Sequence, residues 1–162
     1  MKTKKGLVTV IVLLNIASAS AQGLFDKLGD SKHITTVNIS KALLNMFPAM
    51  ADQVNVTGVD IKGIVSKFEQ IDIYTSKNKE GSRLIRTEAQ KLQSQSKSYE
   101  ILMRIKDEVE EVIFYAEKEK DRFKSLVMFV DGKDECTLIR LLGSFTTEDI
   151  QNITKKIEPF AQ

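Results

Sequence analysis

The chain has 162 residues, with 24 basic and 22 acidic side chains and one cysteine. This near-neutral balance excludes proteins that attract nucleic acid or anionic lipid through a strong overall positive field. The single cysteine, Cys136, excludes an intrachain disulfide, so packing alone must hold the fold together.

The first 21 residues have the pattern of a secretory signal peptide. Three lysines precede the apolar run of residues 7–14, and Ala19-Ser-Ala21 provides a small-x-small cleavage site. The apolar run is short for a membrane span, which makes an uncleaved anchor the less favoured alternative. We therefore expect an exported chain that begins at Gln22 after cleavage, with no integral membrane span. The leader holds three of the 24 basic side chains and none of the 22 acidic ones, so the mature chain has a formal charge of −1.

A flexible lead-in over residues 22–33 is expected before the single domain, residues 34–162. The first half of this domain is predicted to alternate between strands and helices: strand 34–39, helix 41–50, strand 68–75 and a helix around 84–92. Ser40 suits the N-cap of the first helix, and Pro48 should kink or end it. Alternation places Ile71 and Asp72 on opposite faces of the second strand. The second helix has an apolar stripe, and Glu88 is expected on its outward face.

The second half predicts four strands and a final helix: strands 99–105, 112–116, 123–130 and 136–142, then a helix capped by Thr146 and stopped by Pro159. Residues 99–105 alternate as a strand does, although part of their spacing also suits a helix; the polar break before them favours a strand. An acidic loop is expected at 106–111. The pair Asp131-Gly132 is a strong hairpin signal, because glycine adopts positive φ freely.

The order β-α-β-α-β-β-β-β-α predicts an α+β fold. We expect a two-layer sandwich with a largely antiparallel sheet and helices packed mainly on one face. Residues 126–130 are apolar at nearly every position, which is typical of a central strand covered on both faces. If helices cover only one face, loops or a partner must cover the other.

No catalytic, metal or cofactor motif is evident in the sequence. His33 is the only histidine, so a serine or cysteine nucleophile lacks an evident base. The match Ser94-x-x-Lys97 lacks the companion motifs of penicillin-recognising enzymes. Acidic residues cluster around Glu110 and Glu111, which a charged, solvated loop explains better than a glycosidase pair. Cys136 opens an apolar strand, where cysteine usually behaves as a small buried hydrophobe rather than a reactive thiol.

Three residues are candidates for contact with a ligand or partner. Arg140 interrupts an apolar strand, so its charge must be paired or reach water; Glu117 or Glu119 across the strands would pair it, and a ligand is the alternative. Tyr115 could anchor a ligand in a cavity between sheet and helices. Phe47 lies in a Met and Phe stripe that is usually core but could form an exposed partner-binding surface.

The chain resembles the domain of unknown function 4252 family, small exported proteins of Bacteroides-type Gram-negative bacteria. The resembling stretches are the leader ending Ala-Gln, residues 37–44, residues 99–105, the three strands at 112–142, and the closing run Leu142-Gly-Ser-Phe-Thr-Thr-Glu-Asp-Ile150. The resemblance implies export, periplasmic or extracellular, and supplies no catalytic residue or cofactor. It also suggests a link to envelope stress signalling.

These observations favour a non-enzymatic binding or protein-interaction module of the cell envelope. Its expected partner is an envelope protein, or a second copy of the chain, held through an apolar sheet face. The first alternative is a carrier of a small apolar ligand, and the second is a hydrolase that uses carboxylates such as Glu110 and Glu111.

Overall fold

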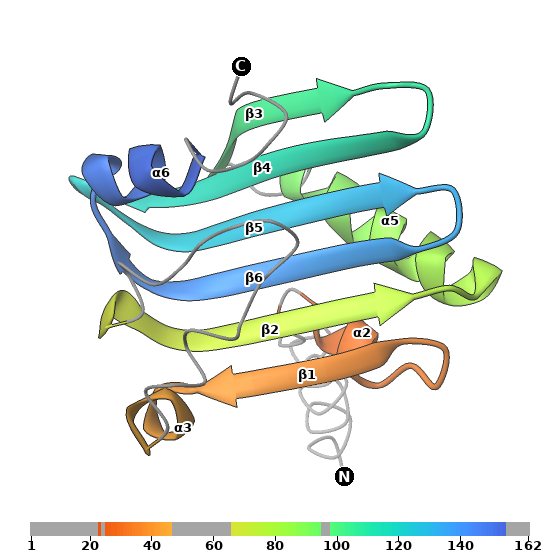
Figure 1. The fold of residues 1–162 in the computed structure, drawn as a ribbon, viewed down its shortest axis with the longest axis horizontal. Helices are drawn as coiled ribbons and strands as arrows, with labels where there is room; N and C mark the ends of the chain where they lie inside the picture. The colour runs from red at the N-terminus through yellow and green to blue at the C-terminus, as the bar shows by residue number, and fades with distance from the viewer. Residues whose placement is uncertain (1–22, 24, 47–65, 95–97, 155–162) are drawn as a thin grey trace, which may run out of the picture.

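The computed structural model describes residues 23, 25–46, 66–94 and 98–154. Within these ranges the chain forms one six-stranded sheet in which every neighbouring pair is antiparallel. The strands lie in the order β1-β2-β6-β5-β4-β3 (Figure 1). Their bounds are β1 Thr35–Ser40, β2 Phe68–Ser76, β3 Tyr99–Lys106, β4 Glu110–Glu119, β5 Arg122–Gly132 and β6 Cys136–Phe145.

Helices lie on both faces of the sheet. The longest, α5 (Lys79–Ser94), and the short α2 (Asp26–Gly29) cover one face, and α3 (Lys41–Met46) and α6 (Thr147–Thr154) lie on the other near one end (Figure 1). The α+β prediction with a largely antiparallel sheet is therefore confirmed. No helix within the described ranges is long and apolar enough to cross a membrane.

The core consists of two hydrophobic clusters, one on each side of the sheet. The cluster on the α5 side includes Phe25, Ile85 and Leu138, and the opposite cluster includes Phe68, Ile139 and Ile153. In β5 the five consecutive residues 125–129 are all buried. The interpretation of this segment as a central strand covered on both faces is thus confirmed.

The predicted strands all form, including the ambiguous segment at 99–105. Both predicted caps are present as well. The Asp149 amide donates to Thr146 Oγ1 at 3.2 Å, while Asp149 Oδ2 accepts from the Thr146 amide at 2.8 Å, a reciprocal cap of α6. At α3, the Leu43 amide donates to Ser40 Oγ at 3.4 Å.

The turns of the hairpins differ from the prediction. Asp131 and Gly132 belong to β5, and residues 133 and 134 make the turn, closed by a 3.0 Å bond from the Gly132 amide to the Glu135 carbonyl. The hairpin signal was right about the connection, and the turn lies within the gap between the predicted strands 123–130 and 136–142, directly after Asp131-Gly132. The acidic loop is also shorter than predicted, because β4 already begins at Glu110.

Two further expectations need correction. Glu88 was expected on the outward face of α5 but is 5% exposed, where it forms an ion pair with Lys91. The lead-in expected to be flexible includes α2, and its Phe25 and Leu28 are buried in the core on the α5 side. The predictions for the leader, Phe47, Pro48 and residues beyond Thr154 fall outside the described ranges.

Candidate functional site

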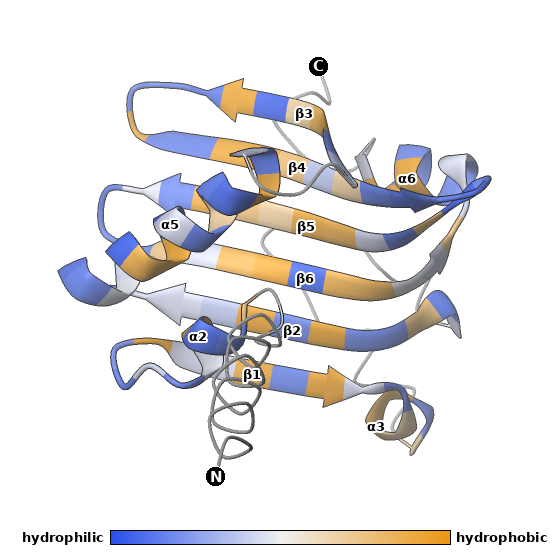
Figure 2. Ribbon diagram, turned by 180° about the vertical axis from the view of Figure 1, so that it is seen from behind, coloured by the Kyte–Doolittle hydropathy of each residue, from blue (hydrophilic) through white to orange (hydrophobic). Residues whose placement is uncertain are grey.

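A row of polar side chains crosses the sheet on the face that α5 and α2 cover. Each strand contributes one residue: Asn38, Asp72, Arg140, Ser125, Glu117 and Tyr99, in the order of the strands. The register places the first three directly opposite one another, and the last three likewise. The row thus consists of two halves that meet between β6 and β5. Figure 2 shows this face, with α5 crossing the end of the sheet remote from α6.

Asp72 is the centre of the first half and is fully buried. Its Oδ1 accepts from Asn38 Nδ2 and Gln70 Nε2, both at 2.7 Å, and its Oδ2 accepts from Arg140 Nε at 2.9 Å and Nη2 at 2.6 Å. The Arg140 guanidinium also lies 5.2 Å from the centre of the Phe25 ring. These donors compensate the cost of burying the carboxylate.

Arg140 therefore pairs with a cross-strand acid, as its position in an apolar strand required. The acid is Asp72, and the prediction of Glu117 or Glu119 was wrong. The reason is the strand order: β6 has β2 as its second neighbour, so Asp72 lies directly opposite Arg140.

The second half of the row is held by a tyrosine. Tyr99 donates its hydroxyl to Ser125 Oγ at 2.9 Å, and Ser125 is fully buried. Burial raises the pKa of the Tyr99 phenol, the bond with Ser125 acts in the opposite direction, and the nearby Glu117 carboxylate raises it further. Tyr99 stays neutral and holds β3 to β5 across β4.

A groove of about 600 Å³ opens beside this row, at the end of the sheet where β6 leads into α6. Three strand pairs shift register there, between Phe68 and Gln70, between Glu117 and Lys118, and between Phe123 and Ser125. Bulges bend a strand and increase its twist, so this end of the sheet is irregular. The groove is lined mainly by charged side chains of β2, β4, β5 and the turn that joins β4 to β5: Glu69, Glu117, Glu119, Lys120, Asp121, Arg122 and Lys124.

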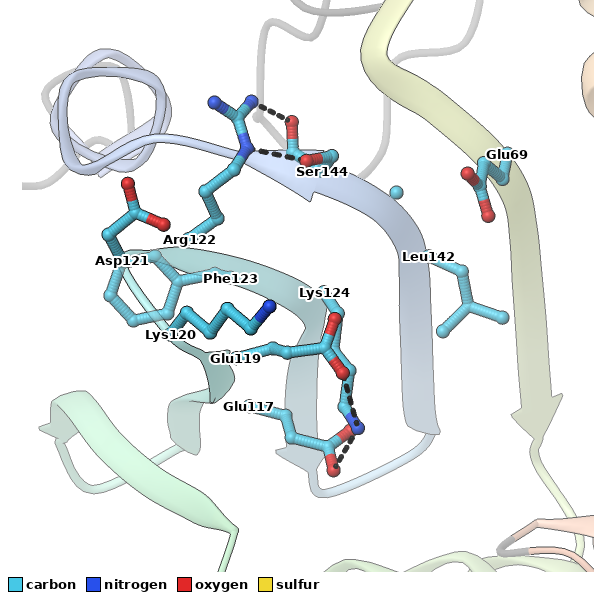
Figure 3. A pocket seen from close by; sticks show the side chains of 11 residues that line it. Glu69, Glu117, Glu119, Lys120, Asp121, Arg122, Phe123, Lys124, Leu142 and Ser144 are labelled. Carbon is cyan, nitrogen blue, oxygen red and sulfur yellow. Dashed lines mark hydrogen bonds and ion pairs between the residues drawn. The ribbon is translucent and has the colours of Figure 1, made fainter.

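Three of these charges, those of Glu117, Glu119 and Lys124, are paired within the groove (Figure 3). Lys124 Nζ lies 3.2 Å from Glu117 Oε1 and 3.8 Å from Glu119 Oε1. Arg122 turns away from these acids and donates to Ser144 Oγ at 2.5 Å and to the Ser144 carbonyl at 2.9 Å. Glu69 lies on the opposite wall, on β2, without an ion pair among the described residues.

Gly143 allows the wall of the groove to form. A Cβ atom at this position would lie 2.2 Å from the Lys67 carbonyl oxygen, so no larger residue fits without movement of the backbone. The segment before β2 thus packs directly against β6 at the bulge.

A second, smaller pocket of about 220 Å³ lies between α5 and strands β3, β4 and β5. Tyr115, Ile113 and Phe129 contribute to its wall, and two ion pairs lie at its rim: Arg86 with Asp131 at 2.7 Å and Arg104 with Glu111 at 3.8 Å. Gln93 Nε2 donates to the Tyr115 hydroxyl at 3.0 Å. Burial raises the pKa of the Tyr115 phenol, and the bond from Gln93 acts in the opposite direction.

The family model of a domain of unknown function, DUF4252, matches residues 25–153. The chain belongs to the DUF4252 family. The match begins at the buried Phe25 and ends at the buried Ile153, so it includes the whole sheet, the groove and the smaller pocket. No curated protein matches the sequence.

In this DUF4252 chain, Arg140 and Tyr115 are on the same side of the sheet but in different places. Tyr115 lies in the wall of the smaller pocket, whereas Arg140 lies in the polar row under Phe25. Phe47, the third candidate, is outside the described residues. The groove has no recognisable signal in the sequence, because its charges lie at turns and bulges that look like ordinary solvated loops.

The remaining reactive side chains are dispersed. Cys136 is fully buried, and burial raises the pKa of its thiol to about 12, which agrees with the interpretation of a structural cysteine. His33 Nε2 lies 2.8 Å from Glu80 Oε2. Glu110 and Glu111 begin β4, and Glu111 contacts Arg104. Among the described residues, no three His, Cys, Asp or Glu side chains gather into a metal site.

Proposed function

We propose that this DUF4252 protein is an exported, non-enzymatic binding module of the cell envelope, and that the charged groove is its binding site. The observation that carries the proposal is the groove itself, about 600 Å³ in volume with acids and cations on its walls. The pattern of the first 21 residues supports export. A role in envelope stress signalling would fit such a module and stays a prediction.

The chemistry of the groove favours a partner segment that carries both charges, such as an exposed peptide loop. Glu69 and Asp121 can attract a lysine or arginine, and Lys120 can attract a carboxylate. Leu142 and Phe123 add apolar surface to the lining. The backbone that carries these charged side chains is held by strands and a tight turn before binding, which lowers the part of the entropic cost of association that comes from the backbone.

The partner surface that we propose differs from the apolar sheet face expected from the sequence. Most apolar side chains of the two core clusters are buried within the single chain, and the exceptions on one face are partly buried: Leu43, Ile73, Met103, Ile105, Val112 and Val130. We therefore assign the contact with an envelope partner to the groove rather than to either face.

Site-specific photocrosslinking in cells tests this function. A photoreactive amino acid at Glu69, on the groove wall, is expected to capture a partner, and the same probe at Glu100 on β3 serves as the control. Lys124→Glu should abolish the capture at Glu69, because it places three acids together and breaks the pairs with Glu117 and Glu119. Identical products from both probe positions, or capture that Lys124→Glu leaves unchanged, would contradict the proposal.

Export is tested separately. The processed protein should be found in the periplasmic or extracellular fraction and should begin at Gln22. A full-length chain that starts at Met1 in the cytoplasm would refute this part of the proposal.

The smaller pocket supports a second candidate function, the carriage of a small ligand with an apolar body. Ile113, Phe129 and the Tyr115 ring offer apolar contact, and the Tyr115 hydroxyl and Gln93 offer a polar anchor. Native mass spectrometry of protein purified from its own host should then show a bound small molecule. Ala89→Leu, which fills the pocket from α5, should remove it, and a spectrum of the bare chain would exclude this candidate.

A further inference from the structure

The two edges of the sheet are protected very differently. The outer strand β3 has the sequence Tyr-Glu-Ile-Leu-Met-Arg-Ile-Lys, with three charged residues and a register shift between Ile101 and Met103. Charges and bulges are the usual devices that prevent an edge strand from pairing with another chain. The other edge strand, β1, reads Thr-Thr-Val-Asn-Ile-Ser; it has no charge and no proline, and its register with β2 is uninterrupted from Thr35 to Ser40.

The β1 edge is also open. Thr35, Val37, Asn38 and Ser40 are exposed, and Val37 is 43% exposed. Among the described residues, the backbone groups of β1 bond only to β2, so alternate N–H and C=O groups along its outer side have no backbone partner within these residues. A regular, uncharged strand of this kind is a template for another strand.

We propose that β1 pairs antiparallel with β1 of a second copy of this chain, about a two-fold axis through Val37. This register places Val37 opposite Val37, Thr36 opposite Asn38, and Thr35 opposite Ile39. Residues of the same parity then share a face, so the two sheets continue into each other with matching faces, as the alternation of side chains requires. The inference concerns an edge of the sheet and does not depend on the function of the groove.

The side chains along β1 complement themselves in this register. The two Val37 side chains form an apolar contact across the axis. Asn38 is exposed and uses Nδ2 to bond Asp72 at 2.7 Å, so its Oδ1 remains an acceptor on this edge strand.

Sedimentation equilibrium of the mature chain, residues 22–162, tests the proposal. The wild type should show a monomer–dimer equilibrium, and Val37→Lys should raise the dissociation constant about tenfold or more, because two lysines then face each other across the axis. Ile101→Lys on β3 is the matched control, since Ile101 is also 43% exposed, and it should leave the constant unchanged. A wild type that is monomeric throughout, or a dimer that Ile101→Lys breaks and Val37→Lys does not, overturns the proposal.

A charge-swap experiment tests the register itself. Mixing Val37→Lys with Val37→Glu should restore a heterodimer, because residue 37 faces itself only about this axis; failure of the mixture to associate overturns the register. In case these variants fold poorly, amide hydrogen exchange of the wild type provides an independent measurement. Protection of residues 35–40 should rise with protein concentration, and protection that is independent of concentration, or that rises only on addition of a different protein, contradicts self-pairing.

Discussion

Removal of the Arg140 side-chain charge is the sharpest test of how the polar row contributes to stability. Arg140→Met keeps an unbranched apolar stem beneath Phe25 but removes the two donors to Asp72 Oδ2. Asp72 is fully buried and would retain only the neutral donors from Asn38 and Gln70. Breaking a buried ion pair by removal of one partner typically costs about 3–5 kcal/mol, and we expect a loss in this range.

Guanidinium denaturation, followed by circular dichroism at one fixed protein concentration, measures the loss. The control is Arg122→Met, because Arg122 is exposed and bonds only to Ser144; it should cost at most about 1 kcal/mol. The double variant Asp72→Leu with Arg140→Met should cost clearly less than the sum of the two single variants, with a coupling of about 1–3 kcal/mol. The reasoning is refuted if Arg140→Met costs no more than Arg122→Met, or if the two single losses simply add.

Three further measurements follow from groups whose pKa is shifted. Because burial raises the pKa of Cys136 to about 12, iodoacetamide at pH 8 should alkylate the native thiol far more slowly than the denatured one, and equal rates would contradict its burial. Burial opposes ionisation of the Asp149 carboxyl, but hydrogen bonds from Lys67 and Thr146 outweigh this effect and hold its pKa below 3.8. These bonds therefore add to the free energy of unfolding above pH 3.8, and the contribution is lost as pH falls through the pKa of the folded state. The stability difference between wild type and Asp149→Asn should then shrink on acidification from neutral pH, and a constant difference would count against the bonds. Burial also raises the pKa of all three tyrosines, Tyr74, Tyr99 and Tyr115. Ultraviolet titration should therefore give phenol midpoints above 10.0, and the fold should lose stability as pH rises above this value. Midpoints at the ordinary value would show that the phenol groups are accessible to solvent.

Local patterns in the sequence carried most of the fold. The alternation of Ile71 and Asp72 between two faces, the continuous apolar run of β5 and the cap at Thr146 each depend on neighbours within a few residues, and each is present in the structure. These features predict elements and their orientation. They contain no information about which strands lie side by side.

The errors arise from contacts between elements that are distant in sequence. The partner of Arg140 was sought among the acids of the preceding strands, whereas the sheet order brings β2 beside β6 and makes Asp72 its neighbour, 68 residues away. Glu88 looked like an outward charge, but Lys91, one turn later on α5, pairs with it and permits its burial. The groove depends on three register shifts, and a register shift is a property of two strands together.

The burial of β5 and β6 also changes where a partner can bind. Apolar residues point to both faces of these strands. If helices cover only one face of the sheet, the other apolar face needs a different cover, and a partner is one candidate. In the structure most of these side chains are buried within one chain, and Val130 and Leu142 are half-buried, so β5 and β6 leave little apolar surface for a partner to cover. Among the described residues, groups available for binding are found instead where strands end or lack a neighbour: charged side chains gather at the bulged end, and backbone donors and acceptors lack a strand partner along β1. The two proposed contacts use different chemistry, ion pairing in the groove and backbone hydrogen bonding at the β1 edge, and they lie on different parts of the sheet, so neither proposal excludes the other.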